Sequence, residues 1–215
     1  NNPNIKHISQ NIWDDFCFYG FIFGILGGRL GEFLFYHPSV FWTAPLQIFK
    51  IWEGGMSIHG GFLGAIGALI FLARKNKISA FRIFDAMAIP MSAALGFGRI
   101  ANYINGEIVG IPTQTSWGIV FPHIDDLLRH PVQLYESAAM FLLAGLLFLV
   151  WKFSKNFTGK LTGLFIGGYG LFRFLVEFWK QSPGFIGDFK TGQILSLAMI
   201  IIGLFLFFFT KKDGK

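Results

Sequence analysis

Cysteine, charge and metal-binding patterns are scarce in this sequence of 215 residues. The single cysteine, Cys17, excludes a disulfide within the chain, and no cysteine and histidine cluster has the spacing of a zinc site. Charged residues make up 14% of the chain, against roughly a quarter in a soluble domain. No signal peptide is visible, because the first residues lack a basic patch followed by a short apolar core. We therefore expect no metal and no cofactor.

Apolar residues are abundant instead: they form 53% of the chain, and phenylalanine alone occupies 28 positions. They fall in blocks near the roughly 20 residues that a helix needs to cross a bilayer. This pattern predicts an all-α polytopic membrane protein, with one domain over residues 1–215. Six membrane-spanning segments are expected, at residues 16–36, 57–73, 83–98, 132–151, 161–178 and 192–209. Segment 83–98 is short and contains Asp85 and Pro90, so a buried or broken helix is the alternative there.

The net charge of +6 would suggest nucleic acid as the partner of a soluble protein. Here the basic residues lie beside apolar blocks, where lysine and arginine in short loops mark the cytoplasmic side, so no nucleic acid is expected. Eleven of the eighteen fall on one side: Lys6, Arg74, Lys75, Lys77, Arg82, Lys152, Lys155, Lys160, Lys211, Lys212 and Lys215. The other side has only Lys50, Arg129, Lys180 and Lys190. Six spans place both ends of the chain, including the C-terminus, in the cytoplasm.

Two longer connections are expected on the outer side. Residues 99–130 are predicted to form a small extracytoplasmic cap, in which Asp125 and Asp126 belong to a solvated loop without a functional role. Residues 37–56 are expected to lie flat in the membrane interface, because amphipathic aromatic rings favour the headgroup region. The aromatic residues concerned are Trp42, Phe49 and Trp52.

Three arginines, Arg29, Arg99 and Arg173, lie within or at the ends of apolar segments. An arginine that faces hydrocarbon costs at least about 2.5 kcal/mol, so one that is retained usually faces a protein-lined cavity that holds an anion. Arg99 belongs to the stretch Gly-Arg-Ile-Ala-Asn-Tyr-Ile-Asn-Gly-Glu at residues 98–107, where a membrane segment would meet water. A phosphate is the first anion to consider.

Local pairing is the structural alternative for these arginines. Glu177 follows Arg173 by four residues and could neutralise it as a buried pair, while Tyr169 precedes Arg173 by four on the same helical face. Arg29 has Glu32 three residues later as a local partner. Three such arginines in one small bundle nevertheless favour an anionic ligand.

His59 lies in Gly-Gly-Met-Ser-Ile-His-Gly-Gly at residues 54–61, at the outer start of a span. Flanking glycines allow a substrate to approach closely, and imidazole is the side chain best suited to take a proton near neutral pH. A hydrogen-bonded packing role is the alternative. Residues 130–136, His-Pro-Val-Gln-Leu-Tyr-Glu, begin the next span, and their polar side chains could either contact a ligand or cap and anchor the helix.

Together with Tyr-Gly-Leu-Phe-Arg-Phe-Leu-Val-Glu-Phe at residues 169–178, these motifs closely resemble bacterial prolipoprotein diacylglyceryl transferases. The resemblance runs in order from Trp13 to Gly203, and Gly-Arg-Ile-x-Asn-x-Ile-Asn-Gly-Glu is the signature of that family. It implies an enzyme of the bacterial inner membrane with its active site toward the outer leaflet. Such enzymes move the diacylglyceryl group of phosphatidylglycerol to the thiol of the lipobox cysteine in a preprolipoprotein and release glycerol phosphate.

The resemblance also implies roles for individual residues. Arg99, Arg173 and His59 match essential positions of the family, and Asn102, Glu107, Gly110 and Tyr169 match further functional positions. From the patterns above we add Arg29, His130, Gln133, Tyr135 and Glu136 as candidate substrate-binding residues. Two departures are visible: the family has a seventh span with a Trp-Tyr-Gly motif before segment 16–36, absent from this sequence, and Ile111 stands where arginine is common.

The implied chemistry suits these residue types. Sulfur attacks a glyceryl carbon and expels a phosphate monoester, so a pair of guanidinium groups is suited to the departing oxygens. A cysteine thiol needs a base, for which His59 is the candidate and Glu107 an alternative. The competing class is a carrier that binds an anion or phospholipid without consuming it. One-sided placement of His59 and Arg99, and the absence of internal repeats, disfavour alternating access.

Overall fold

The computed structural model describes residues 8–153, 158–181, 184–186 and 189–209. The chain divides into two compact units, one ending at Ile83 and one beginning at Phe84, and each is described by itself. All six apolar segments form helices, as predicted. Part of the predicted charge asymmetry lies outside the described residues, namely Lys6, Lys155, Lys211, Lys212 and Lys215.

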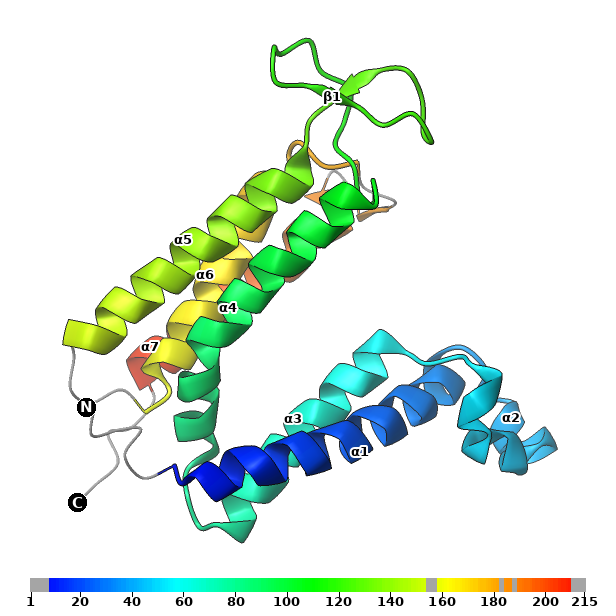
Figure 1. Cartoon of the computed structure of the whole chain (residues 1–215), viewed down its shortest axis with the longest axis vertical. Helices are drawn as coiled ribbons and strands as arrows, with labels where there is room; N and C mark the ends of the chain where they lie inside the picture. The colour runs from blue at the N-terminus through cyan, green and yellow to red at the C-terminus, as the bar shows by residue number, and fades with distance from the viewer. Residues whose placement is uncertain (1–7, 154–157, 182–183, 187–188, 210–215) are drawn as a thin grey trace. The chain divides into compact units, whose positions relative to one another are not determined.

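The first unit is built on α1 (Gln10–Phe35) and α3 (Ile58–Lys75), which lie side by side (Figure 1). Glycines allow their backbones to touch: a Cβ atom on Gly27 would lie 2.3 Å from the carbonyl oxygen of Gly60, and one on Gly64 would lie 2.0 Å from that of Phe23. Any larger residue at these positions would push the helices apart.

Three short helical turns connect α1 to α3. They are α2 (Val40–Thr43), η1 (Pro45–Phe49) and η2 (Ile51–Glu53). Most of their large apolar side chains are exposed, and Trp42 keeps 89% of its surface accessible. The interfacial position expected for residues 37–56 stays a prediction.

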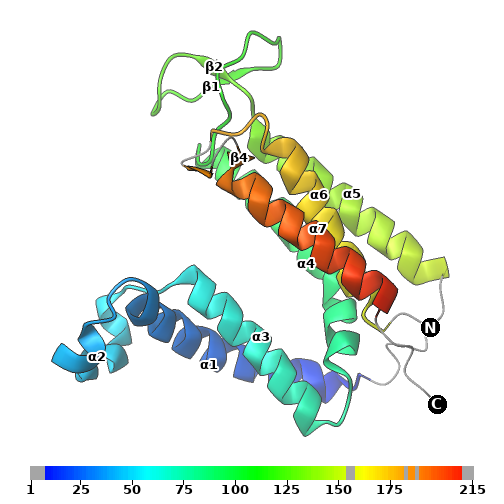
Figure 2. The same ribbon diagram turned by 180° about the vertical axis from the view of Figure 1, so that it is seen from behind.

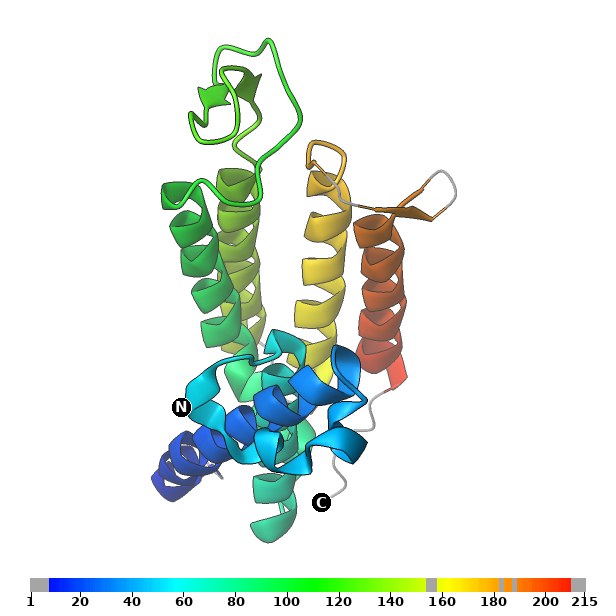
Figure 3. The same ribbon diagram turned by 90° about the vertical axis from the view of Figure 1, so that its right-hand side faces the viewer.

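The second unit is a bundle of α4 (Ala80–Ile104), α5 (Val132–Phe153), α6 (Lys160–Val176) and α7 (Thr191–Phe209), whose helices run side by side (Figure 3). Its core consists of apolar side chains from α4, α5 and α6: Ala88, Ala139, Met140, Leu143, Leu147 and Leu161. Glycines bring α6 and α7 together (Figure 2), since a Cβ atom on Gly203 would lie 2.3 Å from the backbone nitrogen of Gly167.

The alternative of a broken helix for segment 83–98 is wrong. Helix α4 is continuous for 25 residues across Pro90 and extends six residues beyond Gly98. Asp85 is buried because it caps α6: its carboxylate accepts hydrogen bonds from the backbone nitrogens of Gly159 and Thr162, both at 2.7 Å, and from the Thr162 hydroxyl at 2.6 Å. A carboxylate at a helix N-terminus satisfies donors that the helix itself leaves unpaired.

Four helices within the described residues are long and apolar enough to cross a membrane: Gln10–Leu34, Ala80–Ile104, Val132–Phe153 and Thr191–Phe209. Helices α3 and α6 are not among them, so six spans stay a prediction. Residues 105–131 follow α4 and contain a small antiparallel hairpin of β1 (Ile119–Val120) and β2 (Leu128–Arg129). A second hairpin, β3 (Phe185–Ile186) with β4 (Phe189–Lys190), precedes α7.

Candidate active site

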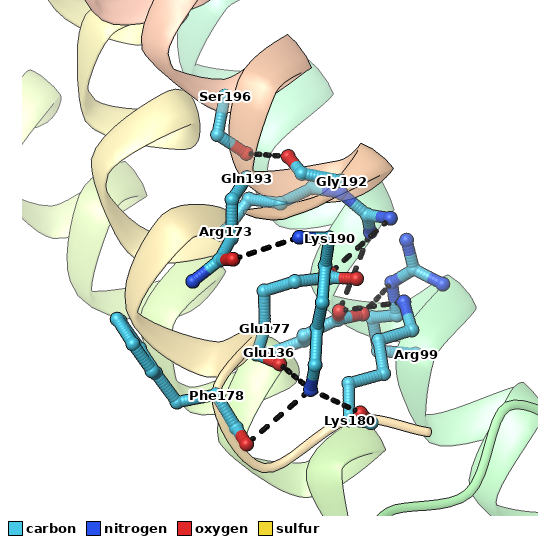
Figure 4. Close-up of polar contacts among 10 residues, drawn as sticks. All are labelled: Arg99, Glu136, Arg173, Glu177, Phe178, Lys180, Lys190, Gly192, Gln193 and Ser196. Atoms are coloured by element: carbon cyan, nitrogen blue, oxygen red, sulfur yellow. Dashed lines mark hydrogen bonds and ion pairs between the residues drawn. The ribbon is translucent and has the colours of Figure 1, made fainter. Parts of the chain in front are cut away.

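Glu136 lies at the centre of a cluster of charged side chains at one end of the second unit (Figure 4). Nε of Arg99 is 2.6 Å from its Oε2 atom. Its other oxygen, Oε1, is 3.4 Å from Nη1 of Arg173 and 3.1 Å from Nζ of Lys180. One carboxylate is therefore shared by three cations.

The four side chains come together because of where their helices begin and end. Arg99 lies near the end of α4, Glu136 near the start of α5 and Arg173 in the last turn of α6, while Lys180 follows α6 in the chain. Arg99 was expected to open the cap, but it is held in a helix that runs on to Ile104. A rigid helix fixes a guanidinium better than a loop does.

A hollow adjoins this cluster, with an empty volume of about 240 Å³. It is lined by charged, aromatic and apolar side chains: Arg99, Glu136, Ala139, Met140, Tyr169, Phe172 and Arg173. This volume includes space that is open to solvent, and the two guanidinium groups in the lining suit an anion. Arg99 and Arg173 thus share both a carboxylate and a hollow.

Glu177 is a distant partner of Arg173. Its Oε2 atom is 3.8 Å from Nη2 of Arg173 and, although buried, receives no hydrogen bond among the described residues. The carboxylate instead lies against the start of α7, where a Cβ atom on Gly192 would be 2.5 Å from its Cδ atom. The positive end of that helix favours a carboxylate, so Glu177 does not simply neutralise Arg173.

Asn102 connects Arg99 to Glu107. Its Oδ1 atom accepts a hydrogen bond from Nη1 of Arg99 at 3.2 Å, and its Nδ2 atom donates to Oε2 of Glu107 at 2.8 Å. The chain turns sharply here, with positive φ angles at Gly106 and Ile108. The backbone oxygen of Glu107 accepts a hydrogen bond from Nε2 of Gln133 at 2.6 Å, which fastens this turn to the start of α5.

Gly110 packs between two backbone segments. A Cβ atom there would lie 2.4 Å from the carbonyl oxygen of His130 and 2.8 Å from that of Trp179, so no larger residue fits. Gly110 forms an antiparallel bridge with Lys180, and the neighbouring Ile111 donates its N–H to the oxygen of Trp179 at 2.9 Å. Gly110, which the family resemblance indicated as a functional position, therefore lets two backbone segments lie in contact. This contact positions Lys180.

His130 and Tyr135 contact each other, and Tyr135 also contacts Trp117 in the segment between α4 and α5. The Tyr135 hydroxyl lies 3.1 Å from Nδ1 of His130 and accepts a hydrogen bond from Nε1 of Trp117 at 2.8 Å. The Trp179 ring packs against both side chains. These contacts favour the anchoring alternative for His130 and Tyr135.

Arg129 and Asp125 form an ion pair that the sequence did not indicate. Nε of Arg129 donates to Oδ1 of Asp125 at 3.0 Å, and its Nη1 donates to the backbone oxygen of Gly110 at 2.9 Å. The Arg129 guanidinium lowers the pKa of the Asp125 carboxyl from its usual value of 3.8. Asp125 thus has a structural partner, and the absence of a functional role stays a prediction.

Lys180 was also missed, because it counted only as a loop lysine. It is buried, and burial is the main cause that lowers the pKa of its ammonium from the usual 10.5, while Glu136 opposes this effect. Lys180 follows Glu177 by three residues, so in a helix it would lie on the same face as Arg173 and Glu177. This spacing could have indicated Lys180 as a site residue.

The first unit contains the other two predicted site residues, Arg29 and His59. All five N–H donors of a guanidinium are used at Arg29. They bind the backbone oxygens of Gln47, Ile48, Lys50, Gly54 and Gly55. These carbonyls, and not Glu32, are the described partners of Arg29, so its expected local pair is wrong.

His59 is exposed in the first turn of α3. Ser57 caps that helix by accepting a hydrogen bond from the backbone nitrogen of Gly60 at 3.3 Å, and Gly54 and Gly55 have positive φ angles. Among the described residues, no group of three or more histidine, cysteine or acidic side chains could hold a metal ion.

The second unit thus places a positively charged hollow at one end of a helical membrane protein, a site for an anionic headgroup. Comparison with known proteins agrees: a family model for prolipoprotein diacylglyceryl transferase matches residues 1–209. The phosphatidylglycerol–prolipoprotein diacylglyceryl transferase of Nitrosomonas europaea is 45% identical over 96% of this chain and 77% of its own length. That of Cupriavidus metallidurans is 42% identical over 97% of this chain and 81% of its own length. The chain belongs to the prolipoprotein diacylglyceryl transferase family.

Proposed function

We propose that this chain transfers the diacylglyceryl group of phosphatidylglycerol to the lipobox cysteine of preprolipoproteins, the first step of bacterial lipoprotein maturation. Family membership supports the reaction. We place the reaction at the hollow because Arg99 and Arg173 both line it and both contact Glu136. The site residues and their roles below are part of the proposal.

The leaving group is stabilised by the arginines. The cysteine sulfur forms a bond to the glyceryl carbon that carries the phosphate, and the bond from that carbon to the phosphate oxygen breaks. The electron pair stays on the oxygen, so glycerol phosphate departs with an added negative charge. Guanidinium groups that are already in position stabilise such charge without reorganising in the transition state.

The nucleophile needs a base, since a free cysteine thiol has a pKa near 8.5 and desolvation raises it. We assign this role to His59, which takes the thiol proton directly or through water and returns it to solvent. The exposed ring and the two glycines before its helix leave it accessible.

The remaining candidates fall into two groups. Asn102 and Glu107 orient Arg99, and Tyr169 lines the hollow beside the headgroup. Gly110, Gln133, His130 and Tyr135 hold the segments around the site in place, and Arg29 does the same for residues 47–55. Glu136 contacts both arginines and is the one candidate of its segment that lines the hollow.

The protein is a helical membrane protein, and we infer the bacterial inner membrane as its location. We propose that all six long helices cross the bilayer, that residues 105–131 form an extracytoplasmic cap and that the C-terminus is cytoplasmic. The unequal distribution of lysine and arginine supports this orientation. It would put the cluster around Glu136 toward the outer leaflet.

Purified protein, phosphatidylglycerol and a lipobox peptide test the proposal. Mass spectrometry should find a diacylglyceryl group added to the peptide's cysteine, and glycerol phosphate should appear in equal amount. A peptide with serine in place of that cysteine is the matched substrate control. Binding of phosphatidylglycerol without either product would identify a carrier and overturn the proposal.

A further inference from the structure

The charges around the hollow do not cancel. Arg99, Arg173 and Lys180 contribute three positive charges, against two negative charges from Glu136 and Glu177. Lys190 adds a further positive charge nearby, because the backbone oxygens of Glu177 and Lys180 that accept from its ammonium at 2.6 and 2.7 Å do not neutralise it. Among the described residues, positive charge therefore exceeds negative charge around the hollow.

Lys180 contributes one charge to that surplus, and its ammonium contacts Glu136 directly. Its side chain is 8% exposed and contacts Oε1 of Glu136, but it does not line the hollow. Lys180 can therefore act on a ligand only through its charge and through Glu136.

A surplus of positive charge distinguishes between phospholipid headgroups. The phosphodiester of phosphatidylglycerol carries one negative charge and its terminal glycerol carries two neutral hydroxyls. Phosphatidylethanolamine has the same phosphodiester, but its ammonium would enter a site already occupied by three cations, where a like charge is repelled. The surplus therefore favours a lipid with net charge minus one over a zwitterion.

Glu136 offers the hydroxyls a partner. It lines the hollow, and each oxygen of a carboxylate can accept more than one hydrogen bond. A carboxylate that three cations already neutralise can still accept a hydrogen bond from a neutral hydroxyl.

We infer that Lys180, acting on Glu136, makes this hollow select a phospholipid with an anionic polyol headgroup over a zwitterionic one. The inference rests on the proposed function in so far as the hollow takes a phospholipid headgroup. Lys180 is then a positioning and selectivity residue, and the arginines hold the phosphate. If the lysine only fastened the segment after α6, its loss would weaken binding of both lipids alike.

Competition between two lipids separates these cases. The chain of 215 residues in detergent is mixed with equal amounts of phosphatidylglycerol and phosphatidylethanolamine of identical acyl chains, and native mass spectrometry counts each lipid bound. Lys180→Met should lower the ratio of phosphatidylglycerol to phosphatidylethanolamine about tenfold, the order expected for removing one charge near the ligand. Lys180→Arg should keep the wild-type ratio. Lys152→Met, at the opposite end of α5, is the matched control and should also keep it.

An unchanged ratio in Lys180→Met would overturn the inference, as would an equal fall in Lys180→Arg. Lys180→Gln serves as a second neutral variant if the methionine variant does not fold, because its amide can still donate to Glu136. Transfer to a lipobox peptide is measured separately on the wild type. Selective binding without transfer would refute the proposed function alone, and transfer with a ratio insensitive to Lys180 would refute this inference alone.

Discussion

Arg99 and Arg173 contact opposite oxygens of the same carboxylate, Oε2 and Oε1 of Glu136, at 2.6 and 3.4 Å. Two guanidinium groups would otherwise repel each other, and the shared carboxylate holds them at one hollow. In the part of the chain that the structure describes, neither arginine has a carboxylate of its own at shorter distance, since Glu177 is 3.8 Å from Arg173. Both are consequently available to an incoming anion.

Replacing Arg173 tests the stabilisation of the leaving group. Arg173→Ala should lower kcat for transfer by about a hundredfold to a thousandfold, as loss of one transition-state donor does elsewhere. The kcat of Arg173→Lys should lie between those of the wild type and Arg173→Ala, because lysine keeps the charge but loses the planar fork. Arg74→Ala, in the last turn of α3, is the control that should keep full activity. Turnover near the wild-type rate in Arg173→Ala would defeat the role.

His59→Gln tests the base. Glutamine keeps similar size and hydrogen bonding but cannot take the thiol proton, so kcat should fall by about a hundredfold or more. Binding of phosphatidylglycerol, measured by native mass spectrometry, should be unchanged. A variant that transfers at the wild-type rate would exclude His59 and leave Glu107 as the next candidate.

Asp85→Ala tests the cap on α6. Three hydrogen bonds to the carboxylate disappear, and the backbone nitrogens of Gly159 and Thr162 lose their described partner. We expect a loss of roughly 2 kcal/mol in the free energy of unfolding. Thermal unfolding in detergent measures it, with Asp14→Ala on the exposed part of α1 as the control. Equal melting temperatures for the two variants would contradict the capping role.

Hydropathy predicted the helices well because helix formation in a membrane protein follows local composition. The expected segment 132–151, for example, corresponds to α5 at Val132–Phe153. Asp85 suggested a broken helix because its hydrogen-bond partners lie 74 and 77 residues further along the chain and cannot be recognised from local composition. Local composition cannot reveal a cap that another helix supplies.

The sequence indicated Arg99 and Arg173 as a pair, but not the carboxylate that joins them. Lys180 reaches Glu136 across 44 residues of sequence, and this contact depends on the backbone bridge at Gly110. The five carbonyl partners of Arg29 were equally hidden, because every residue has a carbonyl and only the folded segment turns these five toward one guanidinium.

Arg29→Lys tests that clamp. Lysine has three donors in place of five and no planar fork, so residues 47–55 should loosen. Trypsin should then cleave after Lys50 on the order of tenfold faster, since each lost hydrogen bond is worth about 1 kcal/mol. Arg74→Lys is the matched control. Equal cleavage rates in both variants would show that Arg29 does not hold the segment.

Alkaline pH tests the charge on Lys180. Burial lowers the pKa of this ammonium below 10.5, with Arg173 and Arg99 adding to the effect and Glu136 opposing it. The folded protein therefore releases the proton at a lower pH than the unfolded chain, so between the two pKa values the free energy of unfolding rises with pH. Affinity for the anionic headgroup should change in the opposite direction, because the positive charge of Lys180 is lost as pH rises through the folded pKa. Arginine stays charged throughout, so Lys180→Arg should keep its preference for phosphatidylglycerol over phosphatidylethanolamine up to about pH 10.5. An equal decline of this preference in the wild type and in Lys180→Arg would refute the selectivity role of Lys180.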